Sequence, residues 1–213
     1  MNTYFKSAGI NWKLSWQNKI FRYQLYTAII FITIILITYP FFFQYIEKRE
    51  GLLFNDIVLN LIPAYDVYFL IFILVWSSTF FMLITAIKNP GIFLMSLVAY
   101  ILLSITRMTS IFLFPLQTPP GIITLIDPLS NYFYGVPFIT KDLFFSGHAS
   151  TLFLIFLCQK NKLSKYYTLV SCICVSILVL VQHIHYSIDV IFAFPFTYLC
   201  YRSAKYIIVT GSK

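Results

Sequence analysis

The residues of this chain that could do acid–base or nucleophilic chemistry are grouped around its three histidines. Two of them, His183 and His185, lie in a seven-residue segment that ends at Asp189 and borders an apolar stretch. If this segment is helical, His185 and Asp189 lie four residues apart on one face. The carboxylate can then accept a hydrogen bond from one imidazole nitrogen and leave the other free to attack an electrophile. The segment therefore predicts a nucleophilic histidine at position 185.

The third histidine, His148, follows Ser146 and Gly147 at the start of another apolar run. A serine at a helix N-terminus is a common cap, and a glycine beside it often only permits a turn, so a structural role is one interpretation. The same geometry also binds phosphate, because free backbone amides, the helix dipole and a hydroxyl converge there. In that case His148 could give a proton to a departing oxygen.

The composition predicts that these residues belong to an integral membrane protein. The 213 residues are 60% hydrophobic, 20% aromatic and 10% charged, which would leave a soluble globule with too much apolar surface. Long apolar runs favour membrane-spanning helices over a barrel. We expect one all-α domain (1–213) whose first 23 residues form an interfacial segment and not a cleavable signal. Six transmembrane helices are predicted, at residues 24–46, 66–87, 91–114, 146–159, 166–184 and 187–208.

The net charge of +8 is interpreted as a topology signal and not as a nucleic-acid footprint. Lysines and arginines gather before the first predicted span, between the second and third, between the fourth and fifth, and after the sixth. The positive-inside rule then places these segments and both termini in the cytoplasm. The histidine segments face the opposite side, which is a periplasm, a lumen or the cell exterior.

Other polar and aromatic groups are predicted near that side. Arg107 lies within the third predicted span, where an arginine costs about 2.5–3.5 kcal/mol at the bilayer centre, so we expect it to face the bundle interior. Asp66 opens the second span, and both a helix-dipole role and contact with a head group remain open. The aromatic segment 131–138 fits either an interfacial belt or a cage for a quaternary ammonium.

A zinc site built from the three histidines and Asp189 is a competing hypothesis. On a continuous helix His183 and His185 would point about 200° apart, so they could not share one ion. We therefore expect neither a metal nor a cofactor. His183 is expected at the rim, where it packs or touches a head group.

The histidine segments resemble motifs of the type 2 phosphatidic acid phosphatase superfamily, and most closely those of its sphingomyelin synthase branch. Residues 142–148, from Asp142 to His148, are similar to the branch motif Gly-Asp-x-x-x-Ser-Gly-His-Thr, with Lys141 where the first glycine is usual and Ala149 where threonine is usual. Residues 183–190 are similar to its motif His-Asp-His-Tyr-Thr-x-Asp-Val.

Weaker similarities extend the resemblance over most of residues 60–195. Arg107, Thr109 and residues 119–121 resemble the third-helix arginine motif with a different spacing, and residues 63–66 are a faint match to the first-loop Pro-x-Pro-Asp motif. The six-helix architecture is also that of the branch. The chain lacks the Lys-x6-Arg-Pro motif of ordinary lipid phosphatases, and Leu178 and Val179 replace their Ser-Arg pair. With few basic groups near the motifs, a singly charged phosphodiester suits the site better than a phosphomonoester.

The resemblance implies a head-group phosphotransferase that acts on membrane lipids. In this mechanism His185, oriented by Asp189, attacks the phosphorus of a glycerophospholipid to form a phosphohistidine, and His148 protonates the leaving alkoxide. A lipid alcohol such as ceramide then accepts the head group. Further substrate contacts are expected from Arg107, Ser146, Gly147, Asp142, Lys141, Asp66 and His183.

Two alternatives remain open at this point. With water as the acceptor, the chain would be a lipid phosphatase or a phospholipase C-like hydrolase. In a non-enzymatic lipid transporter or scramblase, the same polar groups would only line a passage, because intramembrane polar residues mark pathways as readily as catalytic sites. The donor head group, the acceptor and the oligomeric state are not specified by the sequence.

Overall fold

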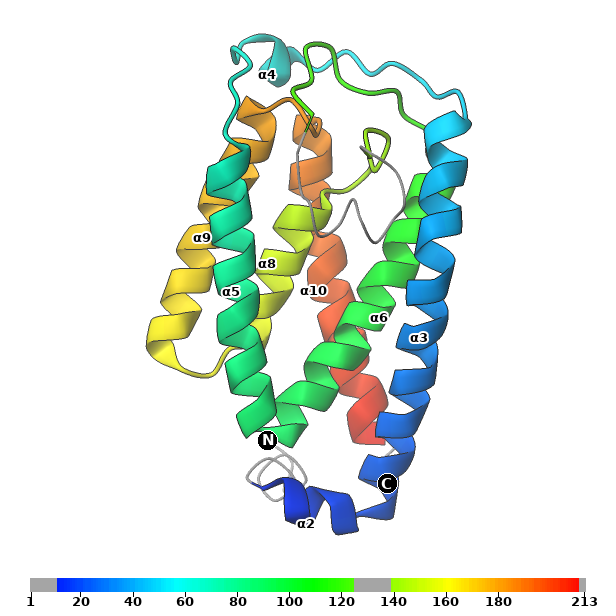
Figure 1. Cartoon of the computed structure of the whole chain (residues 1–213), viewed down its shortest axis with the longest axis vertical. Helices are drawn as coiled ribbons and strands as arrows, with labels where there is room; N and C mark the ends of the chain where they lie inside the picture. Colours follow the sequence, from blue (N-terminus) through cyan, green and yellow to red (C-terminus); the bar gives the residue numbers. More distant parts are fainter. Residues whose placement is uncertain (1–10, 125–138, 211–213) are drawn as a thin grey trace.

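The computed structural model describes residues 11–124 and 139–210 (Figure 1). Within these residues every element is a helix, and the sole strand-like pairing is an isolated bridge between Leu52 and Leu116. The all-α prediction is thus confirmed for the described residues. The predicted aromatic segment 131–138 lies outside them, as do residues 1–10. The helices are α2 (Trp12–Gln17), α3 (Lys19–Lys48), α4 (Ile57–Asn60), α5 (Tyr68–Lys88), α6 (Pro90–Leu113), α8 (Gly147–Cys158), α9 (Lys162–Val181) and α10 (Ser187–Thr210).

Four of these helices are long and apolar enough to cross a membrane, namely α3, α5, α6 and α9. Helix α8 is apolar but has only 12 residues, and the 24-residue α10 is not among the four. A helix occurs at each of the six predicted span positions. The structure therefore supports an integral membrane protein, while the crossing of the membrane by all six helices stays a prediction.

Short polar side chains begin several of these helices. Asn18 accepts hydrogen bonds from the backbone N–H groups of Ile20 and Phe21 at 2.9 and 3.4 Å, at the start of α3. Asn89 caps α6 in the same way, and Asn161 caps α9. A side-chain oxygen at this position satisfies amides that the first helical turn leaves free. These caps fix where the chain turns between α5 and α6 and between α8 and α9.

Helices α3 and α9 differ most from the sequence prediction. Helix α3 begins at Lys19 and not at 24, and it continues through Pro40 to Lys48. Membrane helices tolerate proline because neighbouring groups satisfy the freed carbonyl. Helix α9 ends at Val181 and not at 184, because residues 182–186 form a turn in which His183 has a φ of 56°. This turn contains His185, so it decides where that histidine points.

The packing brings the turn between α9 and α10 to the same end of the bundle as α4 (Figure 1). Helix α8 packs against α9 and α10, α6 packs against α10 and α3, and α5 packs against α9. Fully buried alanines, among them Ala99, Ala149 and Ala204, let these helices approach closely. Helix α2 and the last turn of α10 lie at one end of the bundle, and α4 lies at the other (Figure 1). We call these the α2 end and the α4 end.

The connections at the α4 end are hydrogen-bonded to one another. Leu52 donates from its N–H to the carbonyl of Pro115 at 2.8 Å, and its own carbonyl accepts from the N–H of Gln117 at 2.9 Å. Gly51 lies directly against this pairing: a side-chain Cβ there would be 2.7 and 2.8 Å from the carbonyl carbon and oxygen of Leu116. The bridge therefore requires glycine at this position.

We predict that Gly51→Ala lowers the free energy of unfolding by about 1–3 kcal/mol, because the added methyl group must displace backbone atoms. Thermal unfolding of the purified protein in detergent measures the change. Leu52→Ala is the control, since the Leu52 side chain is 74% exposed and the substitution keeps the paired backbone groups. Equal unfolding temperatures for the two variants would contradict the role assigned to Gly51.

Candidate active site

The carboxylate of Asp189 joins the two predicted motif segments. This side chain is fully buried in the first turn of α10. Oδ1 accepts from the N–H of Phe144 and Oδ2 from the N–H of Tyr186, both at 3.1 Å. The backbone carbonyl of Asp189 also accepts from the N–H of Ser146 at 2.9 Å. A buried carboxylate is stable only with such donors, so these bonds fix residues 144–146 against residues 186–189.

The same carboxylate orients His185. Oδ2 of Asp189 lies 3.3 Å from Nδ1 of His185. An ionised carboxylate only accepts hydrogen bonds, so Nδ1 carries the proton and Nε2 keeps a lone pair. The predicted pair is present, but its geometry arises from the turn before α10 and not from a continuous helix, because α10 begins at Ser187.

His148 lies opposite this pair in the first turn of α8. The ring centroids of His148 and His185 are 6.2 Å apart, with an interplanar angle of 67°. Ser146 is the N-cap of α8: its Oγ accepts from the N–H of Ala149 at 3.4 Å, and the residue is fully buried. The structure thus gives Ser146 the capping role, and it brings His148 to the same cavity as His185.

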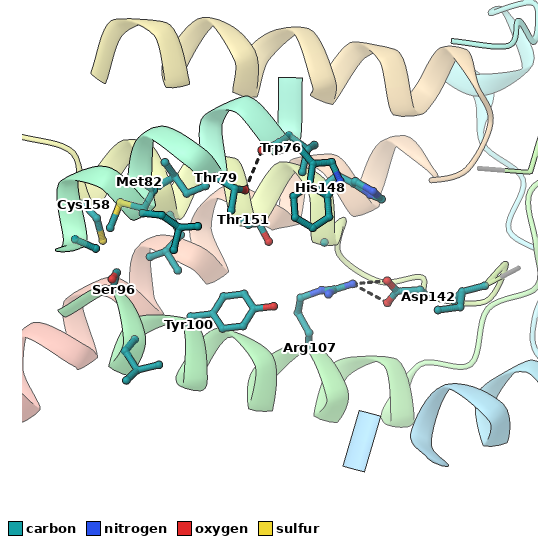
Figure 2. A pocket seen from close by; sticks show the side chains of 18 of the residues that line it. Trp76, Thr79, Met82, Ser96, Tyr100, Arg107, Asp142, His148, Thr151 and Cys158 are labelled. Atoms are coloured by element: carbon teal, nitrogen blue, oxygen red, sulfur yellow. Dashed lines mark hydrogen bonds and ion pairs between the residues drawn. The ribbon is translucent and has the colours of Figure 1, made fainter. Parts of the chain in front are cut away.

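Arg107 of α6 lies against the N-terminus of α8. A Cβ at Gly147 would be 2.6 Å from Cζ of Arg107, so glycine is what allows the guanidinium to approach this helix end. Nη2 of Arg107 donates to both carboxylate oxygens of Asp142, at 2.6 and 2.7 Å (Figure 2). Nε of Arg107 is buried and has no acceptor among the described residues. A positive side chain and a positive helix end therefore meet beside His148, with one carboxylate as counter-charge.

These groups line one end of a cavity of about 530 Å³. Figure 2 shows Arg107, Asp142 and His148 at this end, and Met82, Ser96 and Cys158 toward the other. Most of the wall is apolar and comes from α5, α6 and α8. A cavity of this size and character is typical of a small-molecule or lipid site.

Three other predicted site residues do not line this cavity. Nζ of Lys141 donates to the backbone carbonyls of Glu47 and Arg49 at 3.0 and 2.7 Å, so it satisfies the end of α3. Asp66 is exposed and accepts from the N–H of Tyr68 at 3.3 Å, which is the structural role considered for it.

His183 is the third of these residues. Its ring nitrogens lie 2.9 Å from the carbonyl oxygen of Pro120 and 2.8 Å from that of Ile62. His183 therefore contacts backbone carbonyls at the rim of the site, and it does not line the cavity with His148 and His185. Within the described part of the chain, no group of three or more histidine, cysteine or acidic residues is placed to hold a metal ion.

Two carboxylates that position the site were not predicted. Oδ1 and Oδ2 of Asp56 accept from the hydroxyl and the backbone N–H of Ser187, the first residue of α10. Oε1 of Glu47 accepts from the N–H groups of Thr140 and Lys141, at 2.6 and 2.8 Å, just before Asp142. Asp56 also caps α4, which is a recognisable local pattern, but neither distant partner leaves a signal in the sequence.

Comparison with known proteins gives a match to a family model. The family model described as PAP2 superfamily C-terminal matches residues 141–206. This match supports the PAP2 superfamily. It contains His148, His185 and Asp189 and starts one residue before Asp142. No curated protein and no solved structure matches the chain.

The match of residues 141–206 to this family model suggests a phosphatase or phosphotransferase type of function on membrane lipids. Arg107 lies outside the matched residues, yet the structure brings it against Gly147 within them. The cavity likewise combines residues 141–206 with α5 and α6. The PAP2 segment therefore does not form the candidate site alone.

We predict that Asp56→Asn lowers the unfolding temperature at pH 7, because an amide nitrogen cannot accept the bond from the N–H of Ser187. Burial alone would raise the pKa of Asp56, but hydrogen bonds from Ser187, Leu59 and Val58 outweigh burial and lower the pKa below its ordinary value of 3.8. A lowered folded-state pKa gives stability above the unfolded-state pKa, which is lost as the pH falls through the folded value. The difference in unfolding temperature between wild type and variant should therefore become smaller below about pH 4.

Thermal unfolding of both proteins, from pH 7 to below about pH 4, measures this difference in unfolding temperature. Glu50→Gln is the control, because Glu50 is an exposed carboxylate near the same end of the bundle. A wild-type-like unfolding temperature of Asp56→Asn at pH 7 would remove Asp56 from the residues that position α10.

Proposed function

We propose that the chain is a phospholipid head-group phosphotransferase, similar to sphingomyelin synthase. It would move a phospho head group from a glycerophospholipid to a lipid alcohol such as ceramide. The observation that carries this proposal is the meeting of two histidines on the wall of one largely apolar cavity. His185 has a free Nε2 because Asp189 holds its Nδ1, and His148 lies close enough to exchange protons with a bound substrate. A nucleophile, a proton donor and space for a lipid are the parts that a two-step transfer needs.

The two steps balance without any further reactant. In the first, Nε2 of His185 attacks phosphorus, the bond between phosphorus and the glycerol oxygen breaks, and protonated His148 gives its proton to that oxygen. Diacylglycerol leaves, and His185 carries the phospho head group. In the second, the hydroxyl oxygen of the acceptor attacks phosphorus, His148 takes the hydroxyl proton, and the phosphorus–nitrogen bond breaks. Both histidines return to their starting states.

Arg107 and the first turn of α8 are placed to stabilise the phosphoryl oxygens. The Nε–H group of Arg107 lacks an acceptor in the described part of the chain, and an oxygen of the substrate could fill that place. The amides at Gly147 and His148 belong to a helix N-terminus, which favours negative charge. Donors fixed before the reaction lower the cost of charge that develops in the transition state.

The charges that line the cavity favour a phosphodiester donor. Arg107 is the sole lysine or arginine that lines it among the described residues, and Asp142 already neutralises its charge. The basic group expected from Lys141 is directed to the end of α3. A phosphomonoester brings close to two negative charges and a phosphodiester brings one, so the diester is the better electrostatic match.

A hydrolase of the same superfamily is the second candidate, because the PAP2 match applies equally to phosphatases. A phospholipase C-like hydrolase differs from the transferase only in the acceptor of the second step, which is water, whereas a lipid phosphatase would also take a phosphomonoester donor. A purified full-length sample with labelled phosphatidylcholine, phosphatidylethanolamine or phosphatidylinositol, each with and without ceramide, separates them. Label in a sphingophospholipid indicates a transferase, and label in a water-soluble phosphate ester indicates a hydrolase. Label that only crosses the bilayer would indicate a transporter and overturn both.

We predict that His185→Ala abolishes turnover and that Asp189→Asn lowers it by about 10²–10⁴-fold, because the wrong tautomer of His185 is then favoured. Protein incubated with donor lipid carrying radioactive phosphorus, then denatured at neutral pH, should hold label that is stable to alkali and labile to acid. His185→Ala should hold none.

Glu50→Gln is the control for Asp189→Asn, because it changes an exposed carboxylate at the same end. Near-wild-type turnover of His185→Ala would disprove the assignment of the nucleophile.

A further inference from the structure

The cavity is far longer than a head-group site requires. It runs along α6 from Arg107 to Phe93, fourteen residues apart, which corresponds to about 21 Å of helix. Figure 2 shows Arg107 and Asp142 at one end of the cavity and Met82 and Cys158 at the other. The reacting groups occupy only the end nearer to α4.

The remainder of the cavity presents apolar surface. Its wall is formed by residues that include Met82, Leu83 and Ala86 of α5, Phe93 and Leu97 of α6, and Leu154, Ile155 and Cys158 of α8. The hydroxyls of Thr79 and Ser96 also line it, but they donate to carbonyls of their own helices, Val75 at 2.9 Å and Phe93 at 3.0 Å. The hydroxyls of Tyr100 and Thr151 also line the cavity, between its two ends (Figure 2). The wall beyond them is apolar and suits a hydrocarbon chain.

Helix α2 backs the far end of this cavity. Ala86 and Phe93 line the end, on either side of the turn between α5 and α6. The indole of Trp12 donates to the carbonyl of Ile87 and lies edge-on to Phe93, with ring centroids 5.5 Å apart. Trp12 also contacts Phe21 of α3 edge-on. One aromatic residue therefore supports the cavity end from the outside.

We propose that this cavity binds one hydrocarbon chain of the lipid substrate and that Ala86 and Phe93, backed by Trp12, limit the chain length it accepts. This inference rests on the proposed function, because it takes the head group to lie at Arg107 and His185. The phosphate then sits at the histidines, and the tail points toward α2. A chain longer than the cavity would have to displace the end of the wall, which close packing resists.

Two substitutions should move the length limit in opposite directions. Ala86→Leu fills part of the far end and should lower the rate ratio of long-chain to short-chain substrates by at least about tenfold. Trp12→Ala removes the support of Phe93 and should raise that ratio. The assay uses full-length protein and phosphatidylcholines that differ only in acyl length, from ten to eighteen carbons, because each buried methylene adds to the free energy of binding.

Ile84→Phe is the matched control for Ala86→Leu. It enlarges a nearby residue of α5 whose side chain is 36% exposed and does not line the cavity. The ratio should stay at its wild-type value in this variant. An unchanged ratio in Ala86→Leu, with turnover retained, would overturn the inference and leave the proposed function intact.

A second measurement does not depend on turnover. A phosphatidylcholine with a diazirine at the end of one acyl chain should cross-link to residues 82–97 or 151–158 upon illumination. Ala86→Leu should reduce this labelling, and Ile84→Phe should not. Cross-links confined to the outer faces of α3 or α10 would overturn the tail site, even if the head-group chemistry proves correct. Absence of turnover with every donor, together with cross-links at Phe93, would instead overturn the proposed function alone.

Discussion

The buried carboxylate of Asp189 is the constraint on which the site depends. It accepts hydrogen bonds from the backbone of two segments that lie far apart in the sequence, and it faces the imidazole of His185. A buried charge without these donors would be strongly destabilising, so the fold cannot keep Asp189 without also bringing residues 144–146 to it. The carboxylate that needs these backbone donors is also the group that fixes the tautomer of His185. Stability and chemistry are therefore not separable at this residue.

Near Asp189, the unusual backbone angle of Phe144 and the charge of Arg107 are each offset by other contacts. Phe144, which donates to the carboxylate, has a φ of 63° that is uncommon for a bulky residue, and its ring packs against Phe114 and Phe192. Its carbonyl accepts from the hydroxyl of Ser110. On the other side of the cavity, Gly147 gives Arg107 room and Asp142 supplies a counter-charge. Aromatic packing and ion pairing thus offset the local cost of placing these groups.

Local patterns predicted the helices well. Apolar runs and asparagine caps lie in adjacent residues, so a helix is found at each of the six expected positions. The His185 and Asp189 pair was also expected, but on the assumption of a helix that starts four residues earlier than α10 does. The turn around His183 decides this, and it depends on carbonyls of Ile62 and Pro120 that no local pattern reveals.

Contacts between distant segments could not be predicted in the same way. Lys141 precedes a motif and was expected to face the substrate, but free carbonyls at the end of α3 bind its amine instead. The roles of Asp56 and Glu47 were not predicted, because their partners lie more than ninety residues away in the sequence. The length of the cavity could not be predicted either, because it depends on how α5, α6 and α8 pack together.

The chain on each side of residues 125–138 is tied to a helix terminus. Ile123 donates from its N–H to the carbonyl of Gln182 at 3.1 Å, and Thr140 donates to Glu47 at 2.6 Å. The bonds that hold residues 139–146 in place do not depend on the path taken between these two points. In mechanical terms, residues 140–144 connect the end of α3 to the start of α10, so a shift of α3 would be transmitted to the segment that leads into His148.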